Sequence, residues 1–103
     1  MSRQLQQITA IIYDKRGRVL SVGQNSYIKT HPMQARLAQK VGLEHKIYLH
    51  AEISAITRCM DISRAHRILV TRYNRHGEPA LAKPCPVCAS AIRATPIKII
   101  EHT

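Results

Sequence analysis

The sequence predicts a single α/β domain over residues 1–103, with a mixed β-sheet flanked by helices. Short runs rich in β-branched residues alternate with segments whose apolar residues recur at helical spacing. Glycines and prolines fall between these segments, where turns and helix ends are expected. A length of 103 residues suits one domain, and no internal repeat or linker divides it. The expected order is strand, strand, helix, helix, strand, helix, strand.

The N-terminal part predicts an antiparallel hairpin. Residues 8–13 form an apolar run with β-branched side chains, which is typical of a strand. The polar segment 14–18 contains Gly17 and predicts a tight turn. A partner strand is expected at 19–22, ending at Gly23.

Two helices are expected next. Pro32 can open the first, in which Met33, Leu37 and Val41 recur every four residues before Gly42 ends it.

The second of these helices is predicted from about His50 to Met60. Leu49, Ile53, Ile56 and Met60 fall on one face of it.

The C-terminal part predicts a strand, a loop, a helix and a last strand. Residues 67–73 hold a continuous apolar run, typical of a strand covered on both sides. Residues 74–83 are polar and predict a loop. A third helix is expected from Pro86 to 95, because Pro96 cannot continue it. The final strand is expected at 97–101.

The chain is strongly basic. Sixteen Lys and Arg residues against six Asp and Glu give a net charge of +10. Such a surface attracts nucleic acid or phosphorylated small molecules, although the same charge can simply serve solubility. No segment approaches the roughly 20 apolar residues that span a bilayer, and the polar segment 1–7 does not resemble a signal peptide. Three cysteines, an odd number, cannot form a closed disulfide framework, and a cytoplasmic location without a membrane partner is expected.

Two motifs carry the chemistry: His50-Ala51-Glu52 and Pro84-Cys85-Pro86-Val87-Cys88. Together they match His-x-Glu followed by Pro-Cys-x-x-Cys, the signature of zinc deaminases. Cys85 and Cys88 lie three residues apart, so both sulfurs fall on one face of a first helical turn, where the helix dipole favours thiolates. With His50 they supply three zinc ligands and leave the fourth position for water, the pattern of a catalytic site.

Glu52 is expected to move protons rather than to bind zinc. His50 and Glu52 can converge only if the metal sits over a helix N-terminus, so the sequence predicts two helix starts that face one metal. A structural zinc site or a redox Cys-x-x-Cys is the alternative. A structural site usually needs a fourth ligand, and Cys59, the only other cysteine, is expected on the opposite side of its helix.

From about residue 8 to 101, these motifs resemble the cytidine deaminase superfamily. The segment 89–92 resembles the helix of deoxycytidylate deaminases and of their tRNA adenosine deaminase relatives. Asn25 resembles the asparagine that hydrogen-bonds the substrate sugar or base, and residues 29–32 resemble small phage and bacterial members. The resemblance implies bound zinc and a homo-oligomer. It also implies a further strand and helix, so the chain, ending at Thr103, is expected to be a C-terminally short member whose last strand a partner subunit covers.

Three functions remain open. The favoured one is deamination of a cytosine nucleotide or nucleoside such as dCMP, with Ala51 in contact with substrate and Lys29, His31 or Arg72 holding a phosphate. The second is deamination of a base within RNA or single-stranded DNA. Net charge favours it, whereas the absence of Trp and Phe weakens it, because single-strand binders stack bases on aromatic rings. The third is a non-catalytic zinc-binding module, against which the intact Glu52 argues.

Overall fold

A computed structural model describes residues 7–25, 50–74 and 76–103 of the chain. The first predicted helix, at 32–41, lies outside the described residues, as do Lys29 and His31.

The N-terminal hairpin is confirmed. Strand β1 (Gln7–Tyr13) pairs antiparallel with β2 (Val19–Gln24). The turn between them is organised by Asp14, whose Oδ1 accepts hydrogen bonds from the backbone N–H groups of Arg16 and Arg18, both at 2.9 Å. Gly17 adopts a φ of 84°, a conformation that glycine reaches without a steric penalty.

Strand β3 (Arg67–Tyr73) is the centre of a mixed five-stranded sheet. It pairs antiparallel with β1 on one side. On its other side, β5 (Ile99–His102) runs parallel to its first half, and β4 (Pro79–Ala80) pairs antiparallel with its end. The mixed sheet was expected, but β4 was not. The prediction of loop throughout 74–83 is wrong there, because a two-residue strand is too short to show any periodicity.

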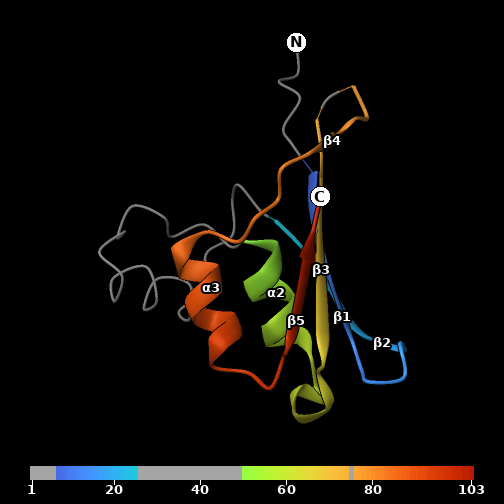
Figure 1. The fold of residues 1–103 in the computed structure, drawn as a ribbon, viewed down its shortest axis with the longest axis vertical. Helices are drawn as coiled ribbons and strands as arrows, with labels where there is room; N and C mark the ends of the chain where they lie inside the picture. The colour runs from blue at the N-terminus through green and yellow to red at the C-terminus, as the bar shows by residue number, and fades with distance from the viewer. Residues whose placement is uncertain (1–6, 26–49, 75) are drawn as a thin grey trace.

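Both long helices of the described chain lie on one face of the sheet (Figure 1). They are α2 (Ala51–Arg58) and α3 (Pro86–Arg93), and a short 3₁₀ turn, η1 (Ile62–Arg64), follows α2. Helix α2 ends at its C-cap Cys59 rather than at Met60. The Met60 side chain is therefore 97% exposed and does not share the apolar face predicted for it.

The core lies between this face of the sheet and the two helices. Each inner strand contributes alternate residues, such as Ile12 from β1 and Ile68 and Val70 from β3, all fully buried. The other face carries Leu69, which is only partly buried, and no helix of the described chain covers it. The prediction that β3 is covered on both sides is thus met on one side only. None of the described helices is long and apolar enough to cross a bilayer.

Candidate metal centre and active site

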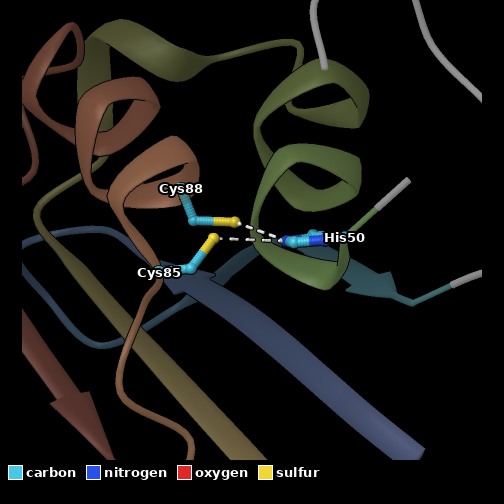
Figure 2. Close-up of side chains that lie close together, drawn as sticks. All are labelled: His50, Cys85 and Cys88. Carbon is cyan, nitrogen blue, oxygen red and sulfur yellow. Dashed lines mark hydrogen bonds between the residues drawn. The ribbon is translucent and has the colours of Figure 1, made fainter. Parts of the chain in front are cut away.

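The N-termini of α2 and α3 bring His50, Cys85 and Cys88 together (Figure 2). His50 is the N-cap of α2, Cys85 is the N-cap of α3, and Cys88 lies in the first turn of α3. The His50 Nδ1 atom is 3.2 Å from the Cys88 Sγ atom and 3.5 Å from the Cys85 Sγ atom. Pro86, at the first position of α3, has no N–H to leave unpaired and presets the helical φ, so the helix can begin directly after Cys85.

This donor set fits zinc. The ligand atoms of the three residues all lie within 4.8 Å of one another. Zinc–sulfur and zinc–nitrogen bonds in a tetrahedral site place the nitrogen and a sulfur about 3.6 Å apart, close to the separations found here. Thiolate and imidazole are also the ligands that zinc prefers. No other group of three or more His, Cys, Asp or Glu side chains shares such a geometry in the described parts of the chain.

The two cysteines differ in their protonation. A side-chain hydrogen bond from Cys88, together with nearby His50, lowers the pKa of Cys85 to about 3. The same hydrogen bond and burial raise the pKa of Cys88. One sulfur is thus held as a thiolate while the other keeps its proton, which metal binding would release.

Glu52 lies beside these ligands, at the second position of α2. Its side chain is buried, with the residue only 6% exposed. Burial raises the pKa of Glu52, and its own backbone N–H, the charge of His50 and the Cys88 side chain oppose part of that rise. A carboxyl group whose pKa is moved toward neutrality is suited to accept and return a proton.

Two residues of β2, for which the sequence predicted no contact with the site, pack against α2 or hydrogen-bond to it. A side-chain carbon at Gly23 would meet the backbone nitrogen of Ala55 and come within 2.5 Å of the carbonyl oxygen of Ala51. The Ser21 hydroxyl donates a 2.8 Å hydrogen bond to the Ala55 carbonyl. Gly23 was predicted to end the strand, but it lies within β2, opposite Ala10. A glycine inside a strand pattern often marks close backbone approach, which was the available signal.

The predicted substrate contacts in the described chain lie at the same end of the sheet as the helix starts. Asn25 directly follows β2, and its Oδ1 accepts a 3.0 Å hydrogen bond from the Ile8 N–H. Ile8 is paired in turn with Arg72, whose guanidinium donates to the Leu81 carbonyl at 3.3 Å. Ala51 is fully buried in the first turn of α2.

The chain matches the family profile of the cytidine and deoxycytidylate deaminase zinc-binding region over residues 3–101. None of the curated proteins matches its sequence significantly.

Proposed function

The chain belongs to the cytidine and deoxycytidylate deaminase zinc-binding family, and from that premise we propose that it removes the amino group of a cytosine nucleotide or nucleoside, such as dCMP or cytidine, by hydrolysis. One observation carries the proposal: a buried carboxyl group, Glu52, lies beside a His50, Cys85 and Cys88 donor set that could hold a metal ion.

His50, Cys85 and Cys88 would hold zinc, which when bound lowers the pKa of a water molecule toward about 7. Glu52 accepts one proton from the attacking water and passes it to the ring nitrogen. It then transfers the second proton of that water, from the hydroxyl group added to the ring carbon, to the leaving amine. A carbon–oxygen bond forms at the ring carbon that bears the amino group, and the bond between that carbon and the amino nitrogen breaks. Ammonia leaves, and cytosine becomes uracil.

Asn25 is proposed to orient the substrate. The bond from the Ile8 N–H fixes its Oδ1 and therefore the direction of its amide group. Arg72, at the same end of the sheet, is proposed to hold a substrate phosphate together with Lys29 or His31. Ala51 is proposed to contribute the backbone of the first turn of α2 to the same pocket.

A base within single-stranded DNA or RNA is the second candidate substrate, favoured by the net charge of +10. The lack of Trp and Phe leaves only tyrosines to stack bases, so the free nucleotide remains the first candidate.

A homo-oligomer is also proposed. All four residues of β5 are exposed, with Ile99 at 41% and Ile100 at 46%, and exposed apolar edge strands favour pairing with another chain. A monomer in light scattering at micromolar concentration would contradict it.

An ammonia-release assay over cytidine, dCMP, adenosine and short oligonucleotides tests the substrate. Glu52→Gln should reduce turnover by at least about 100-fold, because general acid–base catalysis contributes roughly that much, while zinc content stays unchanged. Glu78→Gln makes the same chemical change at an exposed position and should retain full activity. Undiminished turnover by Glu52→Gln would remove the proposed mechanism.

A further inference from the structure

A cavity lies at the end of the domain remote from the metal centre. It has a volume of about 380 Å³ and is lined mainly by charged side chains. Five of them are cationic: Lys15, Arg16, Arg18, Arg64 and Lys98. Asp14 is the only acidic side chain among the lining residues.

The course of the helices separates this cavity from the metal centre. Helix α2 starts at His50 and is followed by η1, whose Arg64 lines the cavity. Helix α3 starts at Cys85, and the chain beyond it supplies Lys98. Each helix has eight residues, which is about 12 Å at 1.5 Å per residue. The cavity is thus about one helix length away from the zinc ligands.

The positive charge of the cavity exceeds what Asp14 can neutralise. The Asp14 carboxylate accepts a 3.0 Å hydrogen bond from Arg18 Nε and lies 3.7 Å from an Arg64 nitrogen. For Lys15, Arg16 and Lys98, no ion pair is found among the described residues. Five cations therefore converge on one anion, which Arg18 already pairs.

Stabilisation of helix ends does not explain these cations. Cations near a helix C-terminus are favoured by the helix dipole, and Arg58 and Arg93 occupy the last turns of α2 and α3. Lys15 and Arg16 come instead from the hairpin turn, and Lys98 from the approach to β5.

We propose that this cavity binds phosphate groups. Its volume falls within the range of small-ligand sites. His66 is the only aromatic side chain among its lining residues, and the aliphatic lining is confined to Ala65 and Pro96, so cationic side chains dominate the cavity. Its cations match the charge of phosphate oxygens. The ligand is either a free polyphosphate or the backbone of a nucleic acid, and the site is independent of the deaminase proposal.

The test uses two double variants with the same net charge. Lys15→Gln with Lys98→Gln removes two cavity cations, and Arg58→Gln with Arg93→Gln removes two exposed cations outside it. Inorganic triphosphate is titrated by calorimetry, and a labelled oligothymidylate by fluorescence anisotropy. The cavity variant should bind about tenfold more weakly than the control variant. For the oligonucleotide, a plot of log affinity against log salt should also be less steep for the cavity variant than for the control variant, by about 1.4.

The two probes distinguish the sources of phosphate. A selective loss for triphosphate alone identifies a free ligand, and a selective loss for the oligonucleotide alone identifies a nucleic-acid backbone. Equal losses in both variants, or no binding of either probe to the unaltered protein, would overturn the proposal. Zinc content and ammonia release, measured alongside, should be the same in the cavity variant and the unaltered protein, so that failure here is separable from failure of the deaminase function.

Discussion

Gly23 in β2 lies directly against the first turn of α2, so close that a side-chain carbon there would come within 2.5 Å of the Ala51 carbonyl oxygen. Ala51 stands between His50 and Glu52, and any shift of this turn moves both.

Gly23→Ala should therefore damage the metal centre as well as the fold. Overpacking should cost about 1–3 kcal/mol in the free energy of unfolding, and a displacement of α2 near 1 Å should lower kcat/KM by about 100-fold. Denaturant titration measures the first effect and the ammonia-release assay the second, while zinc titration measures the affinity of the displaced ligands. Gly77→Asn is the control, because the Gly77 backbone is left-handed but has open space around it. Unchanged zinc affinity in Gly23→Ala would show that this contact does not position the ligands.

Zinc content should depend on Cys88 and not on Cys59. Cys88→Ser removes a sulfur that lies 3.2 Å from His50 Nδ1, and the purified variant should hold far less than one zinc per chain. Cys59→Ser alters another buried cysteine, at the other end of α2, and should keep its zinc. Elemental analysis measures the zinc content of both variants, and a thiol count checks the number of cysteines in each. Full zinc content in Cys88→Ser would exclude this thiol as a ligand.

Asn25→Asp separates holding the fold from binding the substrate. Aspartate keeps an oxygen that can accept the Ile8 N–H but lacks the amide donor. Loss of one hydrogen bond to the substrate should reduce kcat/KM by about tenfold, and the melting temperature, measured in parallel, reports any loss of stability. Asn74→Asp is the matched control, since Asn74 Oδ1 likewise accepts backbone N–H groups, from His76 and Glu78. Equal activity in both variants would remove Asn25 from the substrate site.

Acid should weaken the hairpin turn through Asp14. The backbone N–H of Arg18, then that of Arg16 and the Arg18 side chain, lower the pKa of Asp14 below its ordinary value, against some desolvation. A lowered folded-state pKa means that the stabilisation is complete above the unfolded-state pKa and is lost as the pH falls through the folded-state value. Asp14→Asn should lower the melting temperature by a few degrees at pH 7, and the difference should shrink below about pH 4. Asp61→Asn, at an exposed position without a side-chain cap, should show no such trend.

The periodic parts of the fold were predictable from sequence. The hairpin was marked by β-branched residues around Gly17, and α3 by Pro86 and Pro96. Helix α3 ends at Arg93, two residues before its predicted end. The last strand begins at Ile99 rather than at Ile97, because element boundaries depend on pairing that local sequence does not specify.

The metal donor set was predictable because its motifs fix residue types at fixed spacings. Gly23 and Ser21 were missed because their roles depend on contact with Ala51 and Ala55, more than 25 residues further along the chain. Met60 was placed on a buried face because the periodicity continues past Cys59, whereas the helix does not.

The zinc donors come from the starts of two helices, whose N-cap residues His50 and Cys85 stand 35 positions apart in the chain. A bound ion would cross-link the two helix starts. It would close a long loop, much as a disulfide does, and restrict the unfolded chain. Folding stability would then rise with the logarithm of the available zinc concentration. When zinc is scarce, such a protein would therefore lose folded lifetime as well as catalytic turnover.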